Sequence, residues 1–258
     1  MRLSIIIPAR NEEAQIGGTL QAVLRSVARH AHLPLDRLRL AATRCEVVVV
    51  DSGSSDGTPR IVTEFADLFG VRRLHTLRPG APAARNLGAA RSNGEVLVFI
   101  DADTRVPEDA LARIQSLVEE RGGAAGIFPY APQEGGVRAR CWWAFWNGVR
   151  RLPLARAKAM PAFMFCTRQA FQQFGPFDES VAIGEEWPIL GGVYRRNRRE
   201  LVYDHTLRAH TSSRRMQMVR LGYTRLYVKY ALAILFKPAR VHYTDRLRER
   251  PRPGRGGD

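Results

Sequence analysis

The stretch Val96–Thr104, VLVFIDADT, constrains the fold more than any other part of this sequence. Its apolar residues Val96–Ile100 predict a short strand buried on both faces, as in a parallel sheet covered on both sides. The strand is followed by Asp101-Ala102-Asp103. Ligands of α/β sheets bind beyond the carboxyl ends of the strands, and two carboxylates there favour Mg²⁺ held together with substrate phosphates. The alternative is a solvated turn in which Asp103 caps the next helix.

Strands and helices alternate along the first half of the chain. Leu3–Ile7 and Glu46–Val50 predict two more buried strands, and each is followed by a segment with apolar residues at helical spacing. We expect further helices at residues 59–69, 81–92, 109–120 and 169–174. We expect further strands at residues 71–76, 122–130, 163–166 and 201–203. This alternation predicts an α/β fold with a mostly parallel sheet. Glu12, Asp51 and the Asp101/Asp103 pair would then share one edge of the sheet, which favours a nucleotide-type site.

Charge is distributed unevenly along the 258 residues, a length that fits one large α/β domain. Residues 1–136 hold 16 Lys plus Arg and 16 Asp plus Glu, whereas residues 137–258 hold 24 and 9, so the whole formal charge of +15 lies in the second half. Most of these basic residues are Arg, which suits bidentate phosphate contacts. A basic half implies an anionic partner, which can be a nucleoside diphosphate, a lipid surface or nucleic acid. Of these three, we do not expect nucleic acid.

The cysteines and the apolar segments of the sequence give indications of the cellular compartment. Cys45, Cys141 and Cys166 show no metal-site spacing, which suggests a reducing environment. The start MRLSIII passes directly into the polar PARNEE, unlike a signal peptide. The late apolar run Tyr230–Phe236 is far shorter than the roughly 20 residues of a membrane-spanning helix. We expect a cytoplasmic protein.

Four sequence blocks occur in a recognisable order. SIIIPARNEE, VVVVDSGSSDGT, ARNLGAA and FIDADT closely resemble the nucleotide-sugar-binding half of family 2 glycosyltransferases, over residues 1–105. The resemblance implies a GT-A fold, with a Rossmann-like sheet and a C-terminal acceptor-side region. It also implies a nucleoside diphosphate sugar donor, an acceptor hydroxyl and Mg²⁺ or Mn²⁺ as cofactor. Neither Gly-x-x-x-x-Gly-Lys nor Gly-x-Gly-x-x-Gly is present, which argues against ATPases and dinucleotide-binding proteins.

The resemblance also implies roles for individual residues. Asp51 would meet the base, Arg85 would lie against the nucleotide, and Asp103 would hold the metal on the diphosphate. A carboxylate can accept hydrogen bonds from base and ribose groups, and a metal offsets phosphate charge. The full set expected to bind the donor is Pro8, Ala9, Arg10, Glu12, Asp51, Arg85, Asp101, Ala102, Arg214 and Arg215.

The second half carries the candidate catalytic base. A Gly-Pro-Phe-Asp turn at residues 175–178 precedes Glu185 and Glu186. In the family pattern a Glu-Asp pair supplies the base, so this chain departs from it by one methylene at Glu186. Paired acids repel, and one pKa is expected to rise toward a useful value. The alternative is an exposed acidic helix start, favoured by the helix dipole.

Residues near 210 are further candidates. Thr211–Arg215 is expected to open a long helix whose hydroxyls and arginines suit a diphosphate. Related transferases often place a histidine or an arginine here, so His210 is a candidate metal ligand and Arg214 and Arg215 are candidates for the leaving group. A single histidine is more often structural.

Tryptophans of the segment at residues 140–150 leave two interpretations open. Trp142, Trp146 and Val149 share a helical face, which fits either a core helix or a helix lying at a membrane interface. The Arg excess nearby predicts peripheral attachment to the inner face of an anionic membrane and a lipid-linked acceptor.

We expect one glycosyltransferase domain at residues 1–240, with a donor half (1–105) and an acceptor half (106–240), followed by a disordered basic tail at 241–258. The expected reaction is an inverting, metal-dependent sugar transfer. Its rivals are a sugar nucleotidyltransferase and a non-catalytic module that binds nucleotide sugars or anionic lipids.

Overall fold

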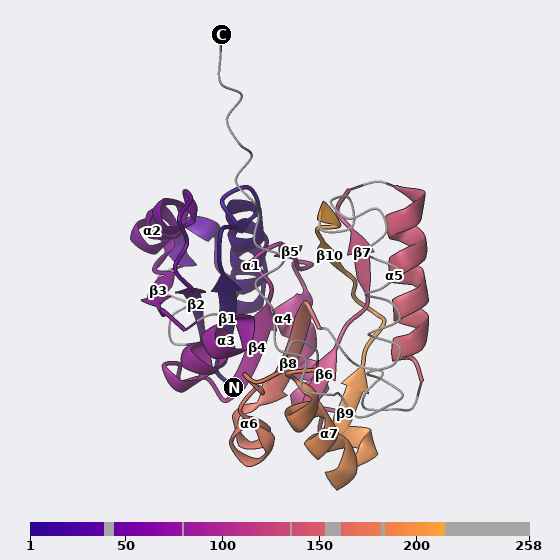
Figure 1. The fold of residues 1–258 in the computed structure, drawn as a ribbon. Helices are drawn as coiled ribbons and strands as arrows, with labels where there is room; N and C mark the ends of the chain where they lie inside the picture. Colours follow the sequence, from indigo (N-terminus) through magenta and orange to yellow (C-terminus); the bar gives the residue numbers. More distant parts are fainter. Residues whose placement is uncertain (39–43, 79, 135, 153–160, 182–183, 215–258) are drawn as a thin grey trace.

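The computed structural model describes residues 1–38, 44–78, 80–134, 136–152, 161–181 and 184–214 (Figure 1). The strands are β1 Leu3–Ala9, β2 Cys45–Asp51, β3 Arg72–His75, β4 Val96–Ile100, β5 Thr104–Arg105, β6 Ala125–Ile127, β7 Tyr130–Pro132, β8 Phe163–Thr167, β9 Leu201–Tyr203 and β10 Ala209–Thr211. The helices are α1 Ile16–Ala31, α2 Thr58–Phe69, α3 Ala81–Ala90, α4 Ala110–Glu119, α5 Val137–Arg150, α6 Arg168–Phe174 and α7 Trp187–Arg196, with a 3-10 turn η3 at Arg198–Glu200.

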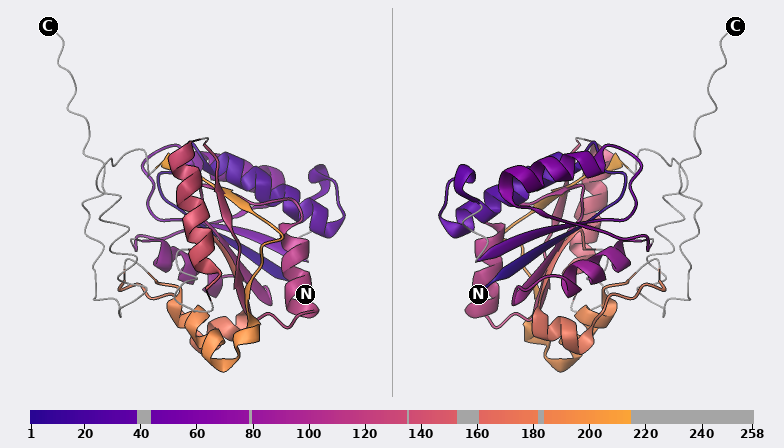
Figure 2. Two further views of the ribbon diagram at one scale, coloured as in Figure 1. Left: turned by 90° about the vertical axis from the view of Figure 1, so that its right-hand side faces the viewer. Right: turned by 90° about the vertical axis from the view of Figure 1, so that its left-hand side faces the viewer.

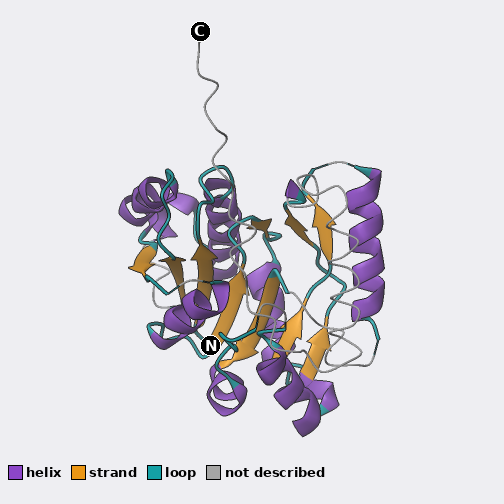
Figure 3. Cartoon of the chain, in the orientation of Figure 1, coloured by secondary structure: helices purple, strands orange, loops and turns teal. Residues whose placement is uncertain are grey.

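The central sheet has the strand order β3-β2-β1-β4-β8-β6-β9 within the described chain. β3, β2, β1 and β4 are parallel, as the alternation predicts, whereas β8 runs antiparallel to both β4 and β6. Every residue of β1, β2 and β4 is buried, because helices cover both faces of these strands (Figure 3). The predicted α/β fold with a mostly parallel sheet is confirmed.

Two layers of helices enclose the sheet (Figure 2). On one face α1 and α4 pack against β1 and β4 through residues such as Ile16, Leu20 and Leu111. On the other face α3 lies close to β1, and a Cβ on Gly88 would come within 2.4 Å of Ile6 Cγ2. A glycine is therefore required where this helix meets the sheet. This close packing fixes α3 against the sheet, and with it Arg85, one turn before Gly88.

A smaller sheet, β5-β10-β7, lies beyond the end of β4. The strand expected at 122–130 divides into β6 and β7, because Pro129 between them has no N–H to continue the ladder. Thr211 was expected to open a helix and instead ends strand β10. It pairs with Thr104 of β5, so long-range strand pairing overrides its local preference. Arg214 is the last described residue.

Several predictions lie outside the described residues: Arg215, the remainder of the long final helix and the tail at 241–258. The division at residue 105 stays a prediction, although β4 and β8, from opposite sides of it, pair in one sheet. No helix in the described part of the chain is long and apolar enough to cross a membrane.

Candidate donor and acceptor site

The ends of β1 and β2 form the first part of the site. Parallel pairing places Ala9 opposite Asp51, and both are buried. Asp51 Oδ1 accepts a hydrogen bond from the Ser54 backbone N–H at 3.0 Å, so the turn after β2 orients the carboxylate. His75, at the end of β3, places Nδ1 3.7 Å from Asp51 Oδ2. The sequence interpretation did not include His75; its place at a third strand end was the available signal.

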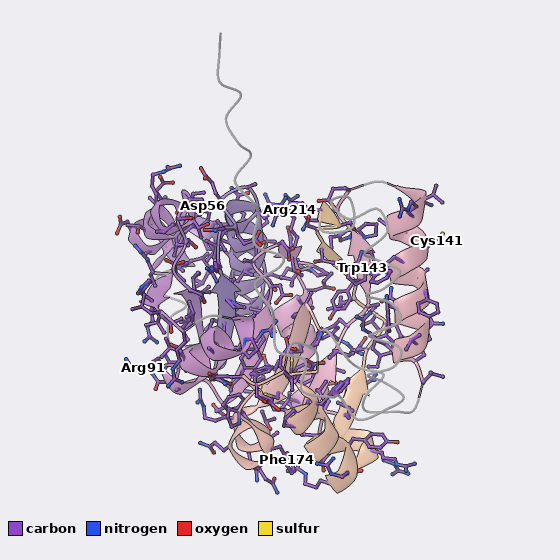
Figure 4. All side chains as sticks on the ribbon, viewed as in Figure 1. Asp56, Arg91, Cys141, Trp143, Phe174 and Arg214 are labelled. Carbon is purple, nitrogen blue, oxygen red and sulfur yellow. The ribbon has the colours of Figure 1, made fainter. Side chains whose placement is uncertain are left out.

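The loop after β1 meets the end of the described chain. Pro8 is buried within β1, whereas Arg10 is exposed. Glu12 is only 7% exposed, and its Oε2 accepts a hydrogen bond from Arg214 Nη2 at 2.8 Å. Two residues expected to bind the donor, 202 positions apart, therefore form an ion pair; Figure 4 labels Arg214.

Arg85 connects the donor side of the sheet with the acid pair. Its Nη2 donates to Asp101 Oδ1 at 2.7 Å and its Nη1 donates to Glu185 Oε1 at 2.9 Å. Burial alone would lower the pKa of the guanidinium, but the two carboxylates raise it above its usual value. Phe177 packs over the guanidinium at 5.5 Å. Arg85 thus holds two acids from different parts of the chain. The sequence predicted that Arg85 lies against the nucleotide and did not predict these ion pairs.

The two acids of the pair have different surroundings. The Glu185 side chain is 18% exposed and faces Arg85. Glu186 is completely buried at the N-terminus of α7, near Arg150 of α5. Burial lowers the pKa of Arg150, and its interaction with Glu186 opposes that shift. Glu185 therefore forms an ion pair with Arg85, whereas Glu186 interacts electrostatically with Arg150. Glu186 is not the exposed helix start that the alternative interpretation described.

Backbone contacts join the Asp101–Asp103 turn to β10. The Ser212 N–H donates to the Asp103 carbonyl at 3.1 Å, and Gln133 Nε2 donates to the carbonyls of both Asp103 and His210, at 2.7 and 3.0 Å. Ala102 is buried, and its carbonyl accepts a hydrogen bond from Thr19. Asp103 and His210 therefore lie on neighbouring segments.

His210 is exposed and lines a cavity of about 310 Å³. The other lining residues are Arg105, Val106, Pro107, Gln133 and Arg208. Among the described residues no group of three His, Cys, Asp or Glu side chains could hold a metal ion alone. The carboxylate of Asp103 fits a cation that takes its remaining ligands from a diphosphate and water, as Mg²⁺ often does. His210 remains a predicted ligand.

Two polar residues that sequence reasoning missed hold loops of the site. Glu134 accepts hydrogen bonds from Ser212 Oγ at 2.7 Å and from the Ser213 N–H at 2.6 Å, and it anchors the segment that leads to Arg214. Asn86 bonds both backbone polar groups of Phe177, at 2.9 and 3.0 Å. Asn86 belongs to the ARNLGAA block. Through Asn86, this block fixes the loop around Phe177, which precedes the acid pair.

The tryptophans of α5 belong to the core. Trp142 and Trp146 are 6% and 3% exposed, and the half-buried Trp143 donates to Ser213 Oγ at 3.3 Å. The core interpretation of this face is therefore correct, and these rings do not form an interfacial surface.

Comparison with known proteins identifies the family. A model of glycosyl transferase family 2 matches residues 4–181. The chain belongs to this family. The resemblance drawn from the four sequence blocks is thereby confirmed, and with it the class of enzyme.

Individual relatives are more distant. Glycosyltransferase AglE of Haloferax volcanii is 27% identical over 187 residues, which cover 70% of this chain and 58% of that protein. An undecaprenyl-phosphate 4-deoxy-4-formamido-L-arabinose transferase of Pseudomonas savastanoi is 25% identical over 220 residues, or 82% of this chain and 60% of the relative. The chain thus spans little more than half the length of either relative.

A solved structure shares the GT-A fold. The mannosyltransferase PcManGT from Pyrobaculum calidifontis, solved with GDP-Man and Mn²⁺, aligns with a TM-score of 0.65 at 20% identity. The alignment covers 92% of this chain and 65% of that one. The predicted GT-A fold is confirmed.

Proposed function

We propose that this family 2 glycosyltransferase moves a sugar from a nucleoside diphosphate sugar to an acceptor hydroxyl, with a divalent cation and with inversion. One arrangement carries the proposal: Arg85 joins Asp101, at the end of β4, to Glu185 of the acid pair. A transferase needs the donor's leaving group and the acceptor's base close together, and this bridge brings the two parts of the chain into contact.

The donor would bind across the ends of β1, β2 and β4. Asp51, held by the Ser54 N–H, offers a fixed acceptor for a base N–H or a ribose hydroxyl. His75 lies beside this carboxylate and would contact the base as well. The GDP-Man bound to the Pyrobaculum mannosyltransferase supports the class of donor.

Asp103 would hold Mn²⁺ or Mg²⁺ on the diphosphate, with His210 as a further candidate ligand. When bound, such a cation offsets the charge that develops on the leaving diphosphate. The Mn²⁺ of the Pyrobaculum structure supports this choice. Arg214, kept beside the donor loop by Glu12 and Glu134, would add positive charge near the phosphates.

Glu186 would act as the base. It would take the proton of the acceptor hydroxyl while that oxygen attacks the anomeric carbon, and the bond from this carbon to the diphosphate oxygen would break with its electrons leaving on the nucleotide. A single displacement inverts the anomeric centre. Glu185 suits this role less well, because protonating it would break its ion pair with Arg85. Since Glu186 is buried, the acceptor has to displace the side chains that cover it.

A lipid-linked acceptor is part of the proposal. The name of the Pseudomonas relative places undecaprenyl phosphate in that enzyme's reaction. The basic second half of this chain suits an acceptor that carries phosphate.

Release of nucleoside diphosphate tests the proposal. The full chain would be incubated with a panel of nucleotide sugars and Mn²⁺, with and without a polyprenyl-diphosphate-linked sugar, whose sugar hydroxyls can act as the acceptor. We expect release from one donor that depends on the acceptor and stops in chelator. Release of inorganic pyrophosphate from a nucleoside triphosphate would instead indicate a sugar nucleotidyltransferase. Donor binding without any turnover over the whole panel would indicate a binding module.

A further inference from the structure

Helix α5 has a second apolar face, opposite its tryptophans. The apolar and small residues of this face recur every three or four positions, as they do along one side of a helix. We call this set the α5 outer stripe: Val137, Cys141, Ala144, Phe145, Gly148 and, just past the helix end, Leu152. Figure 4 shows Cys141 on the outer side of α5 and Trp143 on the inner side.

The outer stripe is open to solvent. Val137, Phe145 and Leu152 are 74%, 56% and 48% exposed, and they make up half of the large hydrophobic residues that are exposed in the described chain. A Cβ added to Gly148 would meet no atom within 4 Å. Isolated exposed hydrophobic residues are common, but a continuous stripe along one helix marks an interaction surface.

Positive charge accompanies the stripe. Arg138, Arg140 and Arg151 are exposed, and the α5 sequence VRARCWWAFWNGVR contains no acidic residue. Arginine can lay its aliphatic part along an apolar surface while its guanidinium reaches a phosphate. An apolar stripe bordered by arginines is complementary to an anionic bilayer surface, where acyl chains and headgroup phosphates lie side by side.

The position of α5 leaves this face accessible. Helix α5 lies at one side of the described part of the molecule, and its outer side faces away from the central sheet (Figures 1 and 2). Its inner side carries Arg150, whose guanidinium lies 4.7 Å from the Tyr130 ring centroid and interacts with Glu186. The outer stripe is therefore the back of a helix whose inner face lies beside the proposed base.

We propose that the α5 outer stripe docks the protein on the surface of an anionic lipid bilayer, with α5 lying in the plane of the interface. The contacting residues are the outer stripe and its flanking arginines, in place of the tryptophans that the sequence suggested. This inference goes beyond the transfer reaction and does not depend on it: docking would occur without donor, metal or acceptor.

The chain offers a built-in site for a probe. Cys141 is exposed on the stripe, whereas Cys45 and Cys166 are buried, and burial raises the pKa of each of these two thiols to about 12. An environment-sensitive dye would therefore react selectively with Cys141 near neutral pH. With vesicles of phosphatidylglycerol and phosphatidylcholine, we expect the emission to shift to the blue and to intensify, and this change to weaken at high salt. Vesicles of phosphatidylcholine alone should produce little change.

Co-sedimentation with the same vesicles then tests individual side chains. Phe145→Ser should lower the bound fraction several-fold, and Gly148→Leu, which enlarges the stripe into open space, should raise it. Leu68→Ser is the matched control, because Leu68 is 67% exposed on α2, far from α5 in Figure 1. Thermal melts would establish that each variant is folded.

Four outcomes would overturn the inference. The protein could stay in the supernatant with anionic vesicles at low salt. The Leu68 and Phe145 variants could lose binding equally. Neutral vesicles could bind as well as anionic ones. The dye signal could instead change with protein concentration when no vesicles are present, which would make the stripe a contact between two copies of the chain.

Discussion

The guanidinium of Arg85 and the carboxylate of Glu185 lie 2.9 Å apart, although 100 residues separate them in the chain. The same guanidinium holds Asp101 at 2.7 Å. Because α3 is packed tightly on β1, Arg85 is a fixed point to which the acid-pair loop is attached. The position of Glu185 is thus determined by the donor half of the fold.

This bridge predicts energetic coupling between Arg85 and Glu185. We expect Arg85→Met and Glu185→Gln each to destabilise the fold, and the double variant to be less destabilised than the sum of the two by about 0.5–3 kcal/mol. The measurement is chemical denaturation of the four proteins in a double-mutant cycle. Arg60→Met with Glu64→Gln, an exposed pair on α2, is the control and should couple far less. Equal coupling in both cycles would contradict a structural role for the bridge.

Removing the proposed base should slow the chemical step alone. Glu186→Gln keeps the shape of the side chain but cannot take a proton, so we expect turnover to fall by about two to four orders of magnitude. Donor affinity, measured by calorimetry, should stay the same, because the base serves the acceptor. Glu185→Gln is the comparison and should lose less activity. A larger loss in Glu185→Gln would move the base to that residue.

The metal prediction concerns Asp103. Asp103→Ala should abolish transfer and should also abolish the enhancement of nucleotide binding by Mn²⁺. The fold should survive, since this acid stands at a strand end and contributes little packing. Nucleotide titrations with and without Mn²⁺ measure the effect directly. Full activity of the unaltered protein in excess chelator would refute a metal role. His210→Ala, tested in the same way, would decide whether the imidazole contributes.

A pH-dependent loss of stability should arise at His30, remote from the site. Burial lowers the pKa of His30 from 6.5, and the positive charge of Arg44 lowers it further. Below pH 6.5 the unfolded chain therefore binds more protons at this position than the folded chain, so stability falls with decreasing pH. The loss begins near pH 6.5 and is complete below the lowered pKa of the folded state.

His30→Gln removes the titrating group and should flatten this part of the profile. Melting temperatures at a series of pH values between about 7.5 and 5 measure it. His32→Gln, an exposed neighbour, is the control. An unchanged slope in His30→Gln would show that other groups cause the loss.

The sequence alone determined the architecture of the donor half. Local patterns predict these elements: apolar runs in β1, β2 and β4, and helical periodicity in α1 and α4. An unbroken apolar run predicts a strand that is buried on both faces. The carboxyl ends of parallel strands lie at the same edge of a sheet, so the location of Asp51 and Asp101 at one edge was predictable as well.

Only the tertiary structure decided what each charged side chain contacts. Arg85 pairs with Glu185, 100 residues away in the sequence, and Arg214 pairs with Glu12, 202 residues away. No local sequence pattern encodes contacts between residues so far apart in the chain. Thr211 forms a strand because β5 and β7 lie on either side of it. The two apolar faces of α5 are equally plausible core faces in sequence. The tryptophan face became the inner one because it meets β7 and Tyr130, which left Phe145 outside.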